Sequence, residues 1–348
     1  MLTPKSPVKK ILLIKFKGIG DVILSTVVLK NIKEMFPNAK IDFLTEKPSA
    51  PLLNEIPFIN EVLIFGTKDK FEIVKQIFRI RKNKYDLVLD LYSNPKSAQI
   101  TFASGARFRA GFPYRGRKYA YNLFGPIERG VHHAGDLHLH FLENIGIPAK
   151  QKEPLIVIPR EAKKFAENYF TSIEQEEKYV ALVPGGGWES KRCDPVKFAE
   201  IGNTVFDKFR TRSIILWGKG DLEEAEEIKK MMGESALLAP KTTFIEMGAI
   251  AEKCKLAIAN DSGPMHLISS LGLPVLALHG PTDPALQGPF GNKHETIRLD
   301  ELECICCNLL VCNRNHECFL QLPIERIMKK IDSLIQKNNI IMTPDEKN

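Results

Sequence analysis

The sequence lacks any long hydrophobic run. Its longest apolar stretches, such as RSIILWG and LPVLALHG, fall far short of the ~20 residues that a membrane-spanning helix needs. The basic residues 1–10 precede an apolar stretch that is too short and too charged for a signal peptide. Low-complexity tracts are absent, and 44% hydrophobic with 26% charged residues is typical of a soluble globular protein. We therefore expect a cytoplasmic protein.

Two common nucleotide-binding fingerprints are also missing. No G-x-x-x-x-G-K-[ST] P-loop occurs, and the first glycine turn reads G-x-G-D rather than G-x-G-x-x-G with a distal acid. An NAD dehydrogenase is therefore disfavoured. The sequence has no recognised nucleic-acid-binding module and no interleaving of basic and aromatic residues, so we expect no nucleic-acid partner.

The chain of 348 residues is longer than one hydrophobic core usually serves, so we expect two domains of about 150 residues each. Its net charge of +7 is uneven: residues 1–150 hold 24 Lys and Arg against 13 Asp and Glu, and the remainder holds 25 against 29. A basic first half favours an anionic partner, such as an anionic substrate or the inner leaflet of a membrane. A solvated basic surface is the alternative.

Short apolar strands alternate with helices along both halves, which is typical of βαβ units and a parallel sheet. In the first half the pattern predicts strands at 9–16, 39–46, 61–66 and 85–92 and helices at 22–36 and 71–82. In the second half it predicts strands that begin at 178, 213, 255 and 274, and helices at 195–209, 222–232, 243–254, 263–272 and 324–337.

The two halves follow the same order of elements, so we expect an α/β protein with two Rossmann-like domains and a working site in the cleft between them. The pattern is interrupted near 150–178. We place the first domain at 1–165, the second at 166–323, and a last helix and tail at 324–348.

Glycine turns follow two strands of the second half. PGGGWESKR (184–192) places Gly186 and Gly187 where backbone N–H groups can approach an anion, and Lys191 and Arg192 could bind phosphate. WGKGD (217–221) offers Asp221 to a sugar or ribose hydroxyl. A plain tight turn is the alternative at both places.

The segment NDSGPMHLISSLGLPVLALHGPTD (260–283) holds an acid, a hydroxyl, a glycine and a histidine within a few residues. They lie where a strand ends and a helix begins, and the unpaired N–H groups of a helix N-terminus favour a phosphate. Ser262 and Gly263 would wrap the anion, and His266 would face it one turn later. Asp261 suits a sugar hydroxyl or the helix cap better. A capped helix with a buried core histidine is the alternative.

A further glycine turn, KGIGD (17–21), follows the first strand. Gly18 and Gly20 could bind an anion, and Asp21 would stand at the start of the next helix. A carboxylate there could take a proton from an incoming hydroxyl. A simple helix N-cap is the alternative.

Three blocks of the sequence resemble the signature blocks of glycosyltransferase family 9, the ADP-heptose:lipopolysaccharide heptosyltransferases of Gram-negative bacteria. They are ILLIKFKGIGDVILSTVVLKNIKEMFPNAKIDFLT, VPGGGWESKRCDPVKFAEI, and ANDSGPMHLISSLGLPVLALHGPTDP with the later GPFG. The resemblance runs in order over nearly the whole chain and includes YDLVLDLYSNPKSA and GARFRAGFP. It implies a GT-B fold: two Rossmann-like domains facing across a cleft, the acceptor in the first, the nucleotide-sugar donor in the second, and a C-terminal helix that crosses back.

The resemblance also implies roles for the matching residues. Asp21 falls on the family's proposed general base, and Lys191 on its donor-phosphate lysine. The block that holds the sugar and the diphosphate falls on Asp261, Ser262, Gly263 and His266. The chain departs from the family's pattern at Gly186 and Gly187, where hydroxyl residues are common, and at Cys193, where tryptophan is common.

We therefore expect an inverting transferase that moves a heptose from ADP-heptose to the inner core of lipopolysaccharide, with no cofactor or metal required. The enzyme would work in the cytoplasm, in peripheral contact with the inner membrane leaflet. Candidate acceptor-binding residues are Gly18, Gly20, Arg107, Arg109, Arg115 and Arg117. The alternatives are a family member with another donor, such as an N-acetylglucosamine nucleotide, and a nucleotide-sugar epimerase of GT-B-like fold.

Five of the seven cysteines crowd into one segment, residues 304–318, called the cysteine-rich loop below. Cys304, Cys307, Cys312 and Cys318 follow the spacing C-x2-C-x4-C-x5-C, which supplies enough ligands for a tetrahedral zinc ion. The spacing is tighter than that of common zinc modules, and a cytosolic protein need not oxidise its thiols. We expect structural thiols, with a structural metal or disulfides as the alternatives.

Overall fold

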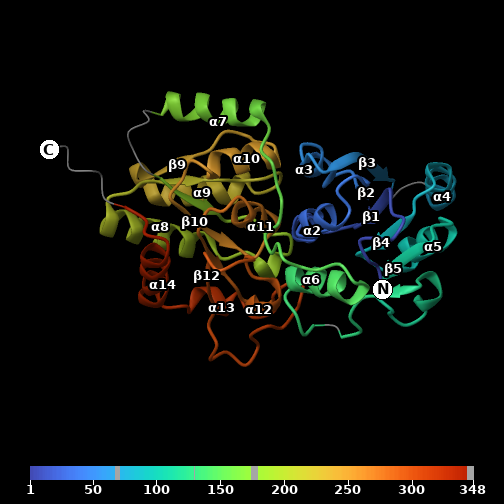
Figure 1. Cartoon of the computed structure of the whole chain (residues 1–348). Helices are drawn as coiled ribbons and strands as arrows, with labels where there is room; N and C mark the ends of the chain where they lie inside the picture. The colour runs from blue at the N-terminus through green and yellow to red at the C-terminus, as the bar shows by residue number, and fades with distance from the viewer. Residues whose placement is uncertain (67–70, 129, 174–178, 343–348) are drawn as a thin grey trace. The chain divides into compact units, whose positions relative to one another are not determined.

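The computed structural model describes residues 1–66, 71–128, 130–173 and 179–342, which belong to two compact units, Met1–Val157 and Ile158–Asn348 (Figure 1). Each unit carries a six-stranded sheet in which all neighbouring strands are parallel. This confirms the predicted α/β class with two Rossmann-like sheets. The boundary that the sequence suggests at 165/166 lies inside a helix, α7 (Arg160–Ser172).

The first unit contains six strands and six α-helices within its described residues. The strands are β1 (Lys10–Ile14), β2 (Lys40–Glu46), β3 (Ile59–Phe65), β4 (Leu87–Asp90), β5 (Phe108–Gly111) and β6 (Leu123–Phe124). The helices are α1 (Ile19–Ser25), α2 (Val28–Met35), α3 (Ala50–Leu53), α4 (Glu72–Asn83), α5 (Pro95–Ala103) and α6 (Ala134–Ile145), with a 3-10 turn η1 (Lys118–Ala120).

The first sheet has the strand order β3-β2-β1-β4-β5-β6. In register, Ile11 of β1 pairs with Ile41 of β2 on one side and with Leu87 of β4 on the other. The strands β2 and β3 therefore lie on one side of β1, and β4 to β6 lie on the other. The point between β1 and β4, where the strand order reverses, is called the switch point below. In open α/β sheets ligands bind outside the carboxyl ends of the strands at such a switch point.

The second unit repeats this plan. Its strands are β7 (Val180–Val183), β8 (Ser213–Ile215), β9 (Ala236–Leu238), β10 (Leu256–Asn260), β11 (Val275–Leu278) and β12 (Glu295–Ile297). Its helices are α7, α8 (Pro195–Phe209), α9 (Leu222–Met232), α10 (Phe244–Ala251), α11 (Gly263–Ser270), α12 (Pro284–Gln287), α13 (Glu317–Leu320) and α14 (Ile324–Lys337), with 3-10 turns η2 (Glu189–Lys191) and η3 (Gly233–Ser235).

The second sheet has the order β12-β11-β10-β7-β8-β9, so its switch point lies between β7 and β10. Alternate residues of β7 enter two hydrophobic clusters, because successive side chains of a strand point to opposite faces. Val180 and Leu182 pack with residues of α8, α9 and α14, whereas Ala181 and Val183 pack with residues of α7, α10 and α11. Both faces of the sheet are therefore covered, which explains why its strands read as continuous apolar runs.

The predicted helix at 22–36 is interrupted. The structure has two helices, α1 and α2, and the break falls at Thr26. The hydroxyl of Thr26 donates to the carbonyl of Ile23 at 2.6 Å and accepts the N–H of Leu155 at 2.8 Å. Threonine hydroxyls that bond to the backbone compete with helical hydrogen bonds, and apolar spacing alone does not reveal this competition.

The predicted last helix is present as α14, and it packs on the second sheet. Ile327, Ile331 and Leu334 are buried in the cluster beneath β7 and α8. Lys330 and Lys337 pair with Glu295 of β12 at 3.0 and 3.2 Å. The expectation that this helix crosses back to the first unit stays a prediction.

Across the part of the chain that the structure describes, no helix combines the length and the apolar character that crossing a bilayer requires.

Gly111, the last residue of β5, offers a test of the side-chain packing in the first unit. A Cβ at this position would overlap the ring of Tyr121, whose hydroxyl donates to Asp90 Oδ2 at 2.8 Å. We expect Gly111→Ala to displace this ring and to lower the free energy of unfolding by about 1–3 kcal/mol, measured by thermal unfolding. Gly187→Ala is the control, because no atom lies within 4 Å of its added Cβ. Equal losses in the two variants would contradict this packing.

Candidate functional site

The two loops at the switch point of the second sheet are joined by Asn260, the last residue of β10. Its side chain donates to the carbonyl of Pro184 at 2.5 Å and accepts the N–H of Cys193 at 3.3 Å. Asn260 is fully buried. Its two bonds therefore fix the glycine turn after β7 against the end of β10.

Lys191 and Asp261 form a buried ion pair between these loops. Lys191 Nζ lies 2.7 Å from Asp261 Oδ2, and the two side chains are 11% and 4% exposed. The ammonium also donates to Gln287 Oε1 at 3.3 Å and lies 4.4 Å from the centroid of the Trp188 ring. The structure thus brings together two residues that the sequence assigns to the donor.

The charge state of Asp261 follows from two opposing effects. Burial alone would raise the pKa of Asp261, but the charge of Lys191 and the hydrogen bonds that the carboxylate accepts outweigh burial and lower this pKa below its ordinary value. The carboxylate is therefore ionised at neutral pH and holds the lysine ammonium in place. That ammonium has three N–H donors, so a phosphate oxygen could bind it as well.

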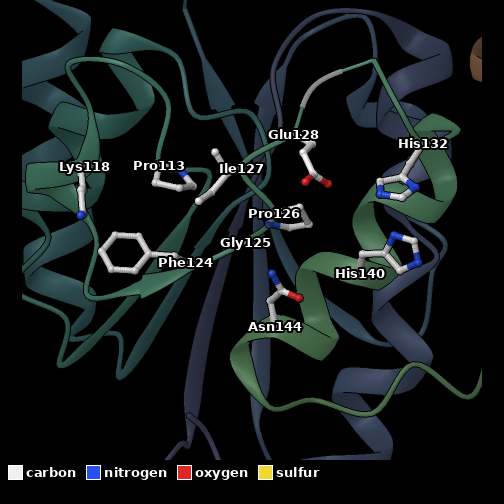
Figure 2. Close-up of a pocket in the computed structure, with 10 residues that line it drawn as sticks. All are labelled: Pro113, Lys118, Phe124, Gly125, Pro126, Ile127, Glu128, His132, His140 and Asn144. Carbon is white, nitrogen blue, oxygen red and sulfur yellow. The ribbon is translucent and has the colours of Figure 1, made fainter.

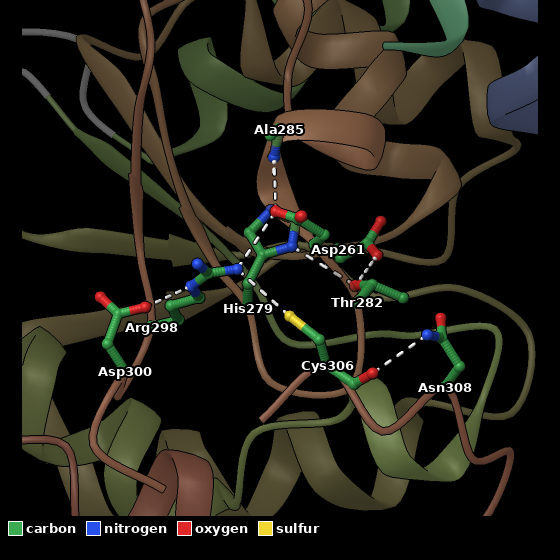
Figure 3. A network of polar contacts seen from close by, with 9 residues as sticks. Asp261, His279, Thr282, Ala285, Arg298, Asp300, Cys306 and Asn308 are labelled. Carbon is green, nitrogen blue, oxygen red and sulfur yellow. Dashed lines mark hydrogen bonds and ion pairs between the residues drawn. The ribbon is translucent and has the colours of Figure 1, made fainter. Parts of the chain in front are cut away.

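The turn after β11 supports Asp261 (Figure 3). The hydroxyl of Thr282 donates to Asp261 Oδ2, and it lies 3.4 Å from Nδ1 of His279. Burial lowers the pKa of His279 to about 4, although the carboxylate of Asp261 acts in the opposite direction. The imidazole is therefore neutral at pH 7 and adds no second cation beside the ion pair.

Helix α11 begins directly after Asp261. Its N-cap is Ser262, whose hydroxyl accepts the N–H of Met265 at 3.3 Å. Asp261 is therefore not the helix cap, which was one of the two roles that its position allowed. His266 follows one turn later and is 7% exposed. The N-terminal end of α11 adjoins the ion pair and contributes partial positive charge there.

Arg192 links the two glycine turns of the second unit. Its Nε donates to the carbonyl of Gly186 at 3.1 Å, and its guanidinium pairs with Asp221 and Glu224, both at 2.9 Å. Arg192 and Asp221 therefore hold the turns together. Of the two cations in this segment, Lys191 is the one beside Asp261.

The cysteine-rich loop packs on η2, the short turn that ends with the lysine of the ion pair. The N–H and the hydroxyl of Ser190 donate to the carbonyls of Leu310 and Leu309 at 3.2 and 2.5 Å. Glu189 accepts the N–H of Cys312 at 2.7 Å. The main chain of the loop therefore fixes the position of this turn.

Arg298 connects the same loop to the turn after β11 (Figure 3). Its guanidinium pairs with Asp283 at 3.1 Å and with Asp300 at 2.5 Å, and it donates to Cys306 Sγ at 3.1 Å. The loop, this turn and the ion pair thus form one connected polar network.

In the first unit Asp21 lies at the switch point, after β1. It occupies the first turn of α1, whose N-cap is Gly18 and which has no side-chain cap. The Asp21 side chain is 52% exposed and lies 3.4 Å from Nζ of the buried Lys15. Gly18 has a φ of +73°, and a Cβ there would overlap the carboxylate. Asp21 is therefore not the N-cap, and its carboxylate is open to solvent beside one cation.

A cavity of about 590 Å³ lies in the first unit, next to the end of β6 and to α6 (Figure 2). Its polar lining includes Lys118, Glu128, His132 and His140, and the two imidazole rings lie edge to face with centroids 4.4 Å apart. Figure 2 shows the histidines on one side and Phe124 on the other. A lysine, a carboxylate, two imidazole rings and an apolar ring surface around one cavity suit a sugar.

The four arginines that the sequence assigns to the acceptor are not among the residues that line this cavity. Arg109 donates to two main-chain carbonyls at 2.8 and 3.0 Å, so its side chain supports the fold. Arg107 lies 5.3 Å from the ring of its neighbour Phe108, and Arg117 donates to the carbonyl of Arg115 at 2.8 Å. Their acceptor role stays a prediction.

The seven cysteines are free thiols. Four of them, Cys304, Cys307, Cys312 and Cys318, line a cavity of about 210 Å³. Burial raises the pKa of Cys318 to about 12, and the neighbouring thiols add to this effect. Within residues 1–66, 71–128, 130–173 and 179–342, no three His, Cys, Asp or Glu side chains are arranged to hold a metal ion. The geometry therefore gives no support to a zinc site in the loop.

Sequence reasoning missed several side chains of these sites. Trp188, Gln287 and Thr282 surround the ion pair, and Lys15 lies beside Asp21. The turn HGPTD follows a strand, which is a signal that its threonine lies at the carboxyl edge of the sheet. No local pattern marks the lysine or the glutamine.

Comparisons with known proteins identify relatives of this chain. The family described as glycosyltransferase family 9 (heptosyltransferase) matches residues 73–316. Lipopolysaccharide heptosyltransferase 3 of Escherichia coli is 27% identical over 297 residues, covering 79% of this chain and 84% of the relative.

Two solved structures share the fold. One is a family 9 glycosyltransferase from Veillonella parvula, with a TM-score of 0.81, 22% identity and coverage of 94% and 97% of the two chains. The other is the ADP-heptose LPS heptosyltransferase II of E. coli, with a TM-score of 0.74, 21% identity and coverage of 95% and 99%. Their likeness confirms the expected GT-B class.

Removal of the charge on Asp261 tests the buried pair. We expect Asp261→Asn to lower the free energy of unfolding at pH 7 by about 3 kcal/mol, because it leaves the part-buried Lys191 without its counterion. Because folding lowers the pKa of Asp261, the stability that the ionised carboxylate contributes is present above pH 3.8, the ordinary pKa of an aspartate. This stability is lost as the pH falls below that value. The difference between wild type and variant should therefore shrink between pH 5 and pH 3, measured by thermal unfolding.

The control for this variant is Asp332→Asn, which breaks the exposed pair with Lys208. We expect it to cost less than about 1 kcal/mol at every pH. A cost of Asp261→Asn that matched this control, or that did not change with pH, would contradict the assignment.

Proposed function

The chain belongs to glycosyltransferase family 9, and we propose that it transfers a heptose from ADP-heptose to the inner core of lipopolysaccharide, with inversion at the anomeric carbon. It is a glycosyltransferase by its family. The choice of heptose is supported by relatives that are named lipopolysaccharide heptosyltransferases and by a structural neighbour named for ADP-heptose. The observation that carries the proposal is the Lys191–Asp261 pair at the start of α11.

The second unit would hold the donor. In the proposed reaction the bond between the anomeric carbon and the diphosphate oxygen breaks, so negative charge grows on the leaving ADP. Lys191 and the partial positive charge at the N-terminal end of α11 would stabilise this charge. Asp261 would then accept a hydrogen bond from a sugar hydroxyl, while Gly186 and Gly187 leave room for the diphosphate. Because a lysine and a helix N-terminus supply the positive charge, the proposed reaction needs no cofactor.

Asp21 would act as the general base. Its half-exposed carboxylate would take the proton of the acceptor hydroxyl as the new bond to the anomeric carbon forms. Lys15, at 3.4 Å, would balance the negative charge of Asp21 before the proton arrives. The acceptor is anionic, and the cavity in the same unit offers the cation of Lys118 and the imidazole N–H groups of His132 and His140. We propose this cavity as the acceptor-sugar site.

We further propose that the enzyme works in the cytoplasm, in peripheral contact with the inner face of the membrane. Its acceptor is anchored in that membrane. The excess of basic residues in positions 1–150 supports this contact.

One observation favours a second candidate for the donor. Gly187 stands where the family commonly has a hydroxyl residue, and an added Cβ there would meet no atom within 4 Å. A family member that uses another nucleotide sugar, such as an N-acetylglucosamine donor, would fit this extra space. An epimerase of the same architecture would convert its nucleotide sugar without any acceptor.

A panel of nucleotide sugars and truncated lipopolysaccharide cores tests the proposal. We expect ADP release from ADP-heptose only when an inner-core acceptor is present, followed by a coupled nucleotide assay. Release from a different donor would identify the second candidate. Conversion of a donor in the absence of acceptor would establish epimerase activity and contradict transfer.

Asp21→Asn tests the general base. We expect kcat to fall about 100- to 10 000-fold, because the amide cannot take the proton of the acceptor hydroxyl. Donor affinity, measured by calorimetric titration with ADP, should be unchanged. The matched control is Asp86→Asn, which removes the same charge where Asp86 accepts the N–H groups of Lys9 and Lys10. Near-normal transfer by a folded Asp21→Asn protein would refute the assignment.

A further inference from the structure

Helix α4 packs one face on the first sheet. Ile80 is fully buried in the core cluster, and Ile73 and Ile77 pack against the same cluster. Glu72 accepts the N–H of Gly66 at 2.9 Å, and it is itself buried. This side of the helix therefore already has its partners within the unit.

The other face of α4 exposes a second set of apolar side chains. Phe71 at the N-cap, Val74 and Phe78 are 70%, 50% and 71% exposed. At 3.6 residues per turn, positions 71, 74 and 78 fall on one stripe of the helix. The core already receives its apolar contacts from the opposite face, so folding of the unit does not account for this stripe.

Basic side chains flank the exposed stripe. Lys75, Arg79 and Lys82 lie on one side of it by helical spacing, and Arg81 lies on the other. The one acidic residue in the sequence of α4 is Glu72, and it belongs to the buried face. Among the described residues of α4 itself, the outward surface therefore carries apolar and basic side chains, and one of its cations, Arg79, pairs with the half-exposed Glu61 of β3.

The helix is also held firmly in its orientation. Arg79 pairs with Glu61 of β3 at 2.5 Å, and Arg81 donates to the carbonyl of Ala103 at the end of α5 at 3.2 Å. Both bonds join the flanks of α4 to neighbouring elements. The stripe thus faces outward on a fixed support.

We propose that this surface of α4, formed by Phe71, Val74, Phe78, Lys75 and Lys82, docks on the surface of an anionic phospholipid bilayer. The three apolar side chains enter the boundary between headgroups and acyl chains, and the lysines bind lipid phosphates. The inference rests on the proposed function in one respect, because that function places the enzyme at a membrane.

The observations favour a bilayer over a protein as the occupant. A stable protein interface needs about 800 Å² on each partner and a core largely free of charge. Here three apolar side chains stand in a single row between cations, which is the arrangement of helices that lie in the membrane interface. The excess of basic side chains on α4 matches an anionic surface and would repel a second copy of α4.

Vesicle sedimentation with the full chain tests the proposal. We expect the protein to bind vesicles that contain about one third phosphatidylglycerol at least tenfold more tightly than vesicles of phosphatidylcholine alone. Phe71→Ser with Phe78→Ser, and separately Lys75→Gln with Lys82→Gln, should each weaken binding to the anionic vesicles at least tenfold. Only the lysine variant should also reduce the salt sensitivity of binding.

Matched controls use side chains of the second unit. Val196→Ser with Ile341→Ser removes two side chains that are both 57% exposed, and Lys230→Gln with Lys253→Gln removes two lysines. We expect these variants to bind vesicles as the wild type does. Equal binding by control and α4 variants, or no preference for anionic vesicles, would overturn the proposal. So would a change in oligomeric state on Phe71→Ser with Phe78→Ser while vesicle binding stays the same.

A second measurement separates this inference from the proposed function. Transfer to a delipidated, water-soluble core oligosaccharide should be unchanged in all four variants, because the substitutions lie outside the proposed donor and acceptor residues. If the wild type transfers no heptose yet binds vesicles through α4, the proposed function fails and the docking surface stands. If transfer occurs but vesicle binding does not depend on α4, the docking surface is refuted and the proposed function stands.

Discussion

The bonds of Asn260 are the constraint on which the donor site depends. A lysine and an aspartate that are seventy positions apart can form a buried pair only if their loops keep a fixed separation. Asn260 supplies this by binding the main chain on both sides of the glycine turn, at Pro184 and at Cys193. The residue is the last of a fully buried strand. The position of the reactive groups is therefore set by the core of the sheet rather than by the loops themselves.

Most of the fold could be predicted from the sequence because the central strands are buried on both faces. The strands β1, β7 and β10 each hold four consecutive apolar residues, with a glycine shortly after the strand, and the sequence predicts each strand close to its observed place. The sequence predicts the edge strand β3 at 61–66, but it does not predict the edge strands β6, β9 and β12. β6 has two residues and β12 has three, and such short segments carry too little periodicity to be distinguished from loops. The break at Thr26 depends on a contact with Leu155, which local sequence cannot reveal.

The residues of the candidate site also divide into those that the sequence predicts and those that it does not. Lys191, Asp261 and Asp21 could be selected because they follow strands, and the carboxyl ends of parallel strands meet at one edge. Gln287 and Lys15 could not, because their roles depend on where the fold places them. Arg109 makes contacts that a basic stretch of sequence does not reveal, and its acceptor role stays a prediction. Its position in a basic stretch suggests a ligand, but two carbonyls of the protein itself accept its hydrogen bonds.

The support that the cysteine-rich loop gives to η2 has a consequence for how this protein can vary. Three contacts from the loop are made by main-chain atoms, the carbonyls of Leu309 and Leu310 and the N–H of Cys312. A fourth is made by a side chain, since His316 Nε2 lies 3.1 Å from Glu189 Oε1. None of these contacts with η2 uses a thiol, so the lysine-bearing turn requires from the loop the route of its main chain and the imidazole of His316. Evolution can therefore exchange thiols of this segment without removing a contact to the turn, provided that the route of the loop is kept, to which the sulfur atoms of Cys306 and Cys312 contribute hydrogen bonds.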